Sequence, residues 1–98
     1  MNIIESKDGD KLLVKVEGRL DTVTAPEFEA FINENLDGIT ELTIDLASLE
    51  YVSSAGLRVL LLAQKHMNRQ GTMTVLNVNE TVGEIFEVTG FSDILTIK

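Results

Sequence analysis

The sequence has no cysteine, one proline and one histidine among its 98 residues. The absence of cysteine excludes disulfides, thiolate metal ligands and cysteine nucleophiles. Long apolar runs are missing as well, since no stretch approaches the ~20 residues that span a bilayer. The opening segment MNIIESKDGD lacks the basic and then apolar pattern of a secretory signal peptide. We therefore expect a cytoplasmic protein that does not bind membranes.

Segments that resemble linkers are also absent. The single proline, Pro26, and seven dispersed glycines mark no linker, repeat or low-complexity stretch, so we expect one domain over residues 1–98. A chain of this length buries only ~60–65% of the surface that it exposes when unfolded. That leaves room for one core and for a functional site on the surface, but not for a cleft between domains.

Basic residues are scarce. The sequence has 8 lysines and arginines and 16 aspartates and glutamates, which give a net charge of −8. This balance opposes contact with the phosphates of nucleic acids or with anionic lipid. The charge is unevenly spread, since residues 51–78 contain three basic side chains and no acidic one. This basic segment carries +3 and the remainder of the chain −11. Such a break in sign can orient a protein partner.

The apolar periodicity predicts alternating strands and helices. Leu12, Val14 and Val16 alternate with other side chains, and Asp8-Gly9-Asp10 is a turn pattern, which together indicate an antiparallel hairpin with Asn2–Ser6. The further predicted elements are helices over Thr24–Gly38, Ser54–Gln70 and Asn79–Thr89, and strands over Leu42–Leu46, Met73–Val78 and Leu95–Ile97.

The order β-β-α-β-α-β-α-β places the chain in the α/β class. Thr24 and Glu27 have the spacing of a capping box, which sets the start of the first helix. Leu42, Ile44 and Leu46 alternate with polar residues, as in a strand with one exposed face. Because strands joined by helices need right-handed parallel crossovers, we expect a mixed, mostly parallel sheet of about five strands with helices mainly on one face.

Ligands and partners of such sheets gather at the carboxyl ends of the parallel strands. Three loops are expected to meet there: Gly18–Val23, Leu49–Ser54 and Asn77–Glu80. In the middle loop, Ser53 and Ser54 stand at the start of the longest predicted helix. A serine there can cap the helix with its hydroxyl, or it can carry a phosphate that the positive end of the helix dipole stabilises.

A projection of this helix at 100° per residue separates two faces. Gly56, Val59, Leu60, Ala63 and Met67 form the face expected to enter the core. The side near Ser54 is polar apart from one leucine and comprises Arg58, Leu61, Lys65, Asn68 and Arg69. A large apolar side chain on a polar stripe can contact a partner, although a single exposed leucine is also common in proteins without one.

Enzymatic functions find little support in the sequence. The only histidine, His66, lies about three turns along the helix from Ser54 and cannot serve as its base. No phosphate-binding Gly-x-x-x-x-Gly-Lys-Ser/Thr run and no metal-ligand spacing are present, so we expect no enzyme, metal or cofactor. Asp21 can act in a site or bond the backbone of its own turn. Nucleotide binding at the loop cluster is a weaker alternative.

The segment Tyr51–Leu57, with the sequence YVSSAGL, resembles the phosphorylation loop of the STAS domain in bacterial anti-sigma factor antagonists. Gly18-Arg19-Leu20-Asp21 is similar to the first conserved loop of that family, and Thr89-Gly90-Phe91 to the turn after its third helix. The resemblance covers the whole chain. It implies a protein that binds an anti-sigma factor serine/threonine kinase and thereby frees a sigma factor.

The same resemblance implies that the kinase phosphorylates Ser54, with Ser53 as the alternative acceptor, and that a metal-dependent serine/threonine phosphatase resets the switch. Taken with the helix projection, it gives the expected partner-binding residues: Asp21, Thr22, Ser53, Ser54, Ala55, Gly56, Arg58, Leu61 and Lys65. We expect a monomer. The alternative is a STAS-type regulatory subunit of a transport complex or a stress-signalling scaffold.

Two features depart from the family pattern. Many members have an aspartate directly before the acceptor serine, where this chain has Ser53. The chain also ends at Lys98, so the additional carboxyl-terminal helix usual in the family is expected to be missing or very short.

Overall fold

The computed structural model describes residues 1–98 and begins with the predicted hairpin. Strand β1 (Asn2–Asp8) pairs antiparallel with β2 (Lys11–Leu20), in a register that sets Ser6 opposite Leu13. The connecting turn needs Gly9, whose φ of +63° lies in the left-handed region that residues with a Cβ rarely adopt. The turn pattern in the sequence therefore predicted the hairpin correctly.

The sheet is mixed and mostly parallel, as predicted. Strands β3 (Glu41–Asp45) and β5 (Thr72–Leu76) extend it in the order β1-β2-β3-β5, with parallel pairing from β2 onward. A further strand, β4 (Leu49–Val52), pairs with the last residues of β2, after a register shift between Gly18 and Arg19. This segment was predicted to be a loop, which is wrong. The four residues LEYV do not alternate strictly between apolar and polar, which is the pattern that marks a strand.

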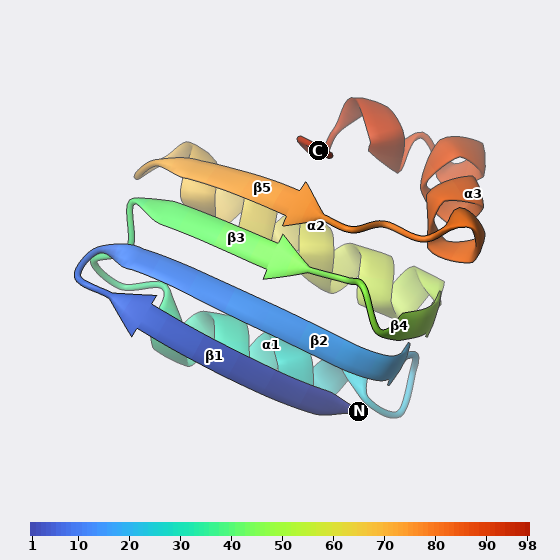
Figure 1. Ribbon diagram of the computed structural model, residues 1–98, viewed down its shortest axis with the longest axis horizontal. Helices are drawn as coiled ribbons and strands as arrows, with labels where there is room; N and C mark the ends of the chain where they lie inside the picture. The colour runs from blue at the N-terminus through green and yellow to red at the C-terminus, as the bar shows by residue number, and fades with distance from the viewer.

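Helices cover one face of the sheet, as predicted. Figure 1 shows α1 (Ala25–Asn35) and α2 (Ser54–Asn68) behind the strands, with α3 (Glu80–Thr89) beyond the carboxyl end of β5. The alternate residues of β2, β3 and β5 are buried against the helices. The largest fully buried side chains are Phe28, Phe86, Leu20, Ile32, Leu36, Ile39, Leu42, Ile44, Leu46, Leu49, Leu60 and Met67. None of the helices has the length and apolar character needed to cross a membrane.

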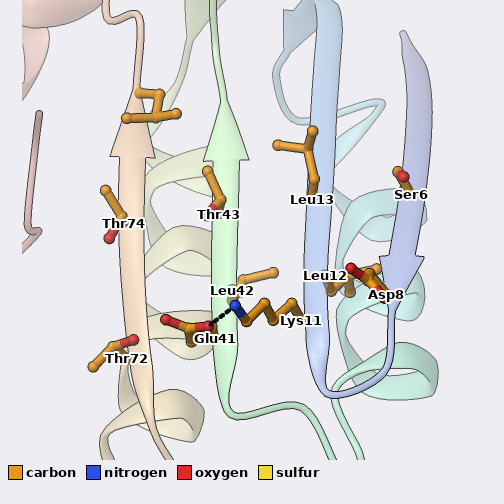
Figure 2. Close-up of a pocket in the computed structure, with 11 residues that line it drawn as sticks. Ser6, Asp8, Lys11, Leu12, Leu13, Glu41, Leu42, Thr43, Thr72 and Thr74 are labelled. Atoms are coloured by element: carbon orange, nitrogen blue, oxygen red, sulfur yellow. Dashed lines mark ion pairs between the residues drawn. The ribbon is translucent and has the colours of Figure 1, made fainter.

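The other face of the sheet carries no helix. Half-buried Leu13, Thr43 and Thr74 lie in a row across neighbouring strands, beside an exposed ion pair of 3.4 Å between Lys11 Nζ and Glu41 Oε2 (Figure 2). The side chains here enclose an open hollow of about 410 Å³. Residues of β1, β2, β3 and β5 line it, and all three loops expected at the carboxyl ends of the strands lie outside its lining.

The predicted last strand, Leu95–Ile97, is reduced to a single parallel bridge between Ile97 and Val75. Gly90, with a φ of +82°, ends α3 in the left-handed conformation, and a short 3₁₀ turn over Phe91–Asp93 follows. This turn lies before Leu95–Ile97, so only the last few residues of the chain run beside β5. Only the N–H of Lys98 and the carbonyl of Thr96 remain to bond β5, through the backbone of Val75.

Candidate functional site

The three predicted loops meet at the carboxyl ends of the strands, where specific hydrogen bonds join them. The N–H of Ser53 donates to the carbonyl of Leu20 at 2.9 Å, and so joins the second loop to the first. The Asn79 side chain donates to the carbonyl of Leu49 at 2.6 Å and its oxygen caps α3 by accepting from the N–H of Val82. The segment Leu49–Ser53, which leads into α2, is therefore bonded to both of the other loops.

The two serines at the start of α2 have different surroundings. Ser53 is the N-cap, with an extended backbone (φ −94°, ψ 175°), but its hydroxyl makes no capping bond and is buried without a hydrogen-bond partner. Ser54 is the first helical residue, and it is exposed. Of the two candidate acceptors, only Ser54 presents its side chain to the surrounding water.

Gly56 explains how closely α2 approaches the strands. A Cβ at this position would lie 2.6 Å from Leu20 Cγ, 2.8 Å from the Leu20 carbonyl oxygen and 2.9 Å from Val52 Cγ2. Gly56 is buried and offers little surface of its own, so its contact with a partner stays a prediction. Its role is to let the helix start pack on the ends of β2 and β4, which sets the position of Ser54.

Asp21 organises the turn between β2 and α1. Its Oδ1 accepts the N–H groups of Val23 at 3.0 Å and Thr24 at 3.1 Å, and Arg19 Nε lies 3.7 Å from its Oδ2. The pKa of Asp21 lies below its ordinary value. The main cause is the hydrogen bond from the Thr24 backbone, and smaller contributions come from the hydrogen bonds of the Val23 N–H and the Thr24 hydroxyl and from the charge of Arg19. The turn-bonding alternative for this aspartate is therefore the one observed.

The predicted capping box at Thr24 does not form. Thr24 is the N-cap of α1, but its side chain makes no capping bond. The hydroxyl instead donates to the Arg19 carbonyl at 2.8 Å and accepts the N–H of Asp21 at 2.9 Å. The Thr24 hydroxyl therefore makes its hydrogen bonds within the turn between β2 and α1, and it does not cap the helix.

The Asp21 turn presents two exposed residues, Thr22 and Val23. Thr22 was predicted to contact a partner, but Val23, which is 86% exposed, was not. No periodic pattern marks a lone valine in a loop, so only the folded turn shows that it points outward. A large apolar side chain held in water by a rigid turn is a candidate contact residue.

A second feature that the sequence did not suggest is the pairing of Arg19 with Tyr51. The Arg19 guanidinium carbon lies 4.6 Å from the centre of the Tyr51 ring, within the range of a cation–π interaction. The two residues are opposite each other on β2 and β4. Since β4 was not predicted, this pairing could not be predicted either.

The outer face of α2 is polar, and the opposite face is buried as the projection predicted. Arg58 and Lys65 are exposed, and Arg58 Nη2 lies 3.5 Å from Glu29 Oε1 on α1. Leu61 is half-buried, whereas Leu62, at 37% exposure, is the more open leucine. Ala55 is also half-buried, so the accessible surface near Ser54 consists mainly of Ser54 itself and Arg58.

Together these features describe a small α/β domain with an exposed serine on the first turn of its longest helix, bordered by a rigid turn and a line of cations. Such a surface suits contact with another protein. The STAS domain family matches residues 3–98, and the chain belongs to that family.

The similar proteins are anti-sigma factor antagonists. The chain is 33% identical over 102 residues to the anti-sigma-B factor antagonist of Staphylococcus aureus, and the match covers 100% of this chain and 94% of that protein. Such antagonists are regulatory proteins rather than enzymes, in agreement with the sequence prediction.

Solved structures agree on the fold. The anti-sigma factor antagonist from Mycobacterium paratuberculosis has a TM-score of 0.88 at 24% identity, covering 98% of this chain and 83% of that one. The Bacillus cell fate determinant SpoIIAA in its phosphorylated form has a TM-score of 0.76 at 16% identity, covering 99% and 91%.

Proposed function

We propose that this protein is an anti-sigma factor antagonist that binds an anti-sigma factor with serine kinase activity and thereby frees a sigma factor. The observation that carries the proposal is the exposed Ser54 on the first turn of α2, in a chain related over its whole length to anti-sigma factor antagonists. The proposal includes a single STAS-like domain over residues 1–98, acting as a monomer in the cytoplasm.

The switching reaction is phosphoryl transfer to Ser54. The Ser54 oxygen attacks the γ-phosphorus of ATP bound by the kinase, the bond to the β-phosphate oxygen breaks, and ADP and the hydroxyl proton are released. A metal-dependent serine/threonine phosphatase reverses the change by hydrolysis, in which water restores the hydroxyl and inorganic phosphate leaves. The chain itself supplies only the acceptor hydroxyl and its position.

The buried surroundings of Ser53 support Ser54 as the acceptor. A kinase must reach the oxygen from outside, and the Ser53 oxygen is buried in the folded chain. Ser54 is exposed, and the close packing at Gly56 holds the start of α2 against the strands. Phosphorylation at Ser53 would require the start of α2 to unwind.

The charge of the surface supports release by repulsion. A phosphate adds about −1.5 to −2 charges at neutral pH. The basic segment, residues 51–78, carries +3, so a phosphate on Ser54 offsets most of the charge that it offers to an acidic partner. The Asp21 carboxylate nearby is already ionised, since its pKa is low. Loss of the complex then needs no refolding of the domain.

The proposed contact surface divides into two groups of residues. One group is accessible to the partner and comprises Thr22, Val23, Ser54, Arg58 and Lys65, with the half-buried Ala55 and Leu61 beside it. The other group positions the first and comprises Asp21, Ser53 and Gly56.

Phosphate mapping tests the proposal. The protein is incubated with ATP and a serine-kinase anti-sigma factor from the same genome, and the phosphate is located by tandem mass spectrometry. We expect one phosphate, on Ser54, which Ser54→Ala abolishes and Ser53→Ala retains. A phosphate on Ser53, or none on either serine, contradicts the assignment.

A further inference from the structure

An ion pair joins the two helices next to the proposed switch. Arg58 Nη2 on α2 lies 3.5 Å from Glu29 Oε1 on α1, and the two side chains are 74% and 37% exposed. A pair this open to water contributes little to stability. Arg58 is therefore held loosely enough for a stronger anion to take it.

The helix brings Arg58 into reach of Ser54. Residues four apart on an α-helix lie on the same face, separated by about 6 Å along the axis. Side chains in a helix also lean toward its amino terminus, so Arg58 can extend toward the turn that contains Ser54. An anion placed before a cation at this spacing is the favourable orientation.

A phosphate on Ser54 competes with Glu29 for the same guanidinium. It carries up to twice the charge of a carboxylate, and arginine can bond two phosphate oxygens at once. Unlike Glu29, the phosphate is on the same helix as Arg58, so the two groups keep a fixed spacing. Both the charge and the geometry favour the phosphate.

We propose that phosphorylation of Ser54 transfers Arg58 from Glu29 to the phosphate. This inference rests on the proposed function for its biological meaning. The transfer removes a cation from the partner-binding surface and leaves the Glu29 carboxylate unpaired on α1. Phosphorylation thus changes the surface twice, once by adding negative charge and once by withdrawing Arg58.

Phosphoserine placed at position 54 during translation, by an expanded genetic code, tests the transfer without any kinase. The second ionisation of the phosphate is followed by phosphorus NMR in the parent protein and in Arg58→Gln, Glu29→Gln and Lys65→Gln. We expect Arg58→Gln to lower the second ionisation constant about two- to five-fold, because the doubly charged phosphate loses its partner. Glu29→Gln raises it, since the competing carboxylate is gone.

Lys65→Gln is the matched control. It also removes one exposed cation from α2, but from a position eleven residues beyond Ser54, about 16 Å along the helix. That distance exceeds the screening length of about 10 Å at 0.1 M salt, so the ionisation constant should stay unchanged. If Arg58→Gln and Lys65→Gln have equal second ionisation constants, the proposed transfer of Arg58 is wrong. The titration involves no partner, so it tests the transfer of Arg58 separately from the proposed function. The transfer can fail although phosphoserine at position 54 weakens partner binding, and it can occur although phosphoserine leaves partner binding unchanged.

Discussion

Two adjacent serines at the start of α2 differ in what they can do, although their side chains are the same. The N-cap residue leaves the helical path, and this turns the Ser53 hydroxyl inward while Ser54 faces water. The sequence predicted the helix start and preferred Ser54, but it could not establish which hydroxyl is buried. The burial depends on the packing of Gly56 against Leu20, and these two residues are 36 positions apart in the sequence.

The Asp21 turn should respond to pH. The folded pKa of Asp21 is lowered, so its contribution to stability is present above the unfolded value of ~3.9 and is lost as pH falls through the folded pKa. The amide signals of Val23 and Thr24, whose N–H groups bond the carboxylate, report on this step by NMR. We expect them to titrate with a midpoint below 3.9, whereas a midpoint at or above that value contradicts the turn's hydrogen bonding.

Val23 should contribute to partner binding without contributing to folding. Val23→Ser is expected to weaken binding to the anti-sigma factor about five- to thirty-fold, which is about 1–2 kcal/mol for an apolar contact. The melting temperature should hardly change, because the side chain is 86% exposed.

Val88→Ser is the control for this change. Val88 is 87% exposed on α3, so the same substitution alters the same amount of accessible surface at another place. We expect its binding, measured by calorimetry, to equal that of the parent protein. Equal losses in both variants would show that Val23 is not a specific contact.

At the scale of elements, the longest helix was predicted best. Its apolar residues recur at helical spacing over fifteen residues, and the predicted core face is buried throughout. The short elements were predicted least well. Strand β4 has four residues, and the last predicted strand forms only a single bridge to β5, because tertiary contacts rather than local pattern decide such segments.

The close approach of α2 to the sheet can be tested with one methyl group. Gly56→Ala places a Cβ 2.8 Å from the Leu20 carbonyl oxygen, and the backbone there cannot yield easily. We expect a loss of about 1–3 kcal/mol in the free energy of unfolding, measured with urea.

Gly83→Ala gives the comparison. This glycine is also helical, but an added Cβ would only touch Val78 Cγ1 at 3.5 Å, an ordinary contact. The higher helix propensity of alanine should raise stability by up to ~1 kcal/mol. If both variants change stability alike, the packing argument for Gly56 is wrong.

For the whole molecule, the mixed sheet with helices on one face follows from the element order and was predicted. The concentration of positive charge in the basic segment was also visible in the sequence. The exposed face of the sheet, with its row of Leu13, Thr43 and Thr74, was predicted only as the uncovered side (Figure 2). The meeting of the three loops near Ser54 was predicted as well, but the hydrogen bonds that join them, such as the one from the Ser53 N–H to the Leu20 carbonyl, could not be predicted from the sequence.

The uneven charge should govern the rate of association. Lys65→Glu is expected to slow binding to the anti-sigma factor several-fold at low salt, and the difference should fade above ~0.5 M salt. Lys7→Glu makes the same charge change on β1, at the opposite edge of the sheet from β5, and should alter the rate less than two-fold. Equal effects of the two variants in stopped-flow measurements would show that only the net charge matters.

The affinity of the protein for its anti-sigma factor, with and without phosphate on Ser54, tests the central claim most directly. Isothermal titration with the unmodified protein and with the protein phosphorylated only at Ser54 gives both dissociation constants. We predict that the phosphate weakens binding at least a hundred-fold, about 2.7 kcal/mol, while Ser54→Ala binds like the parent. Equal affinities for the two forms would contradict the account.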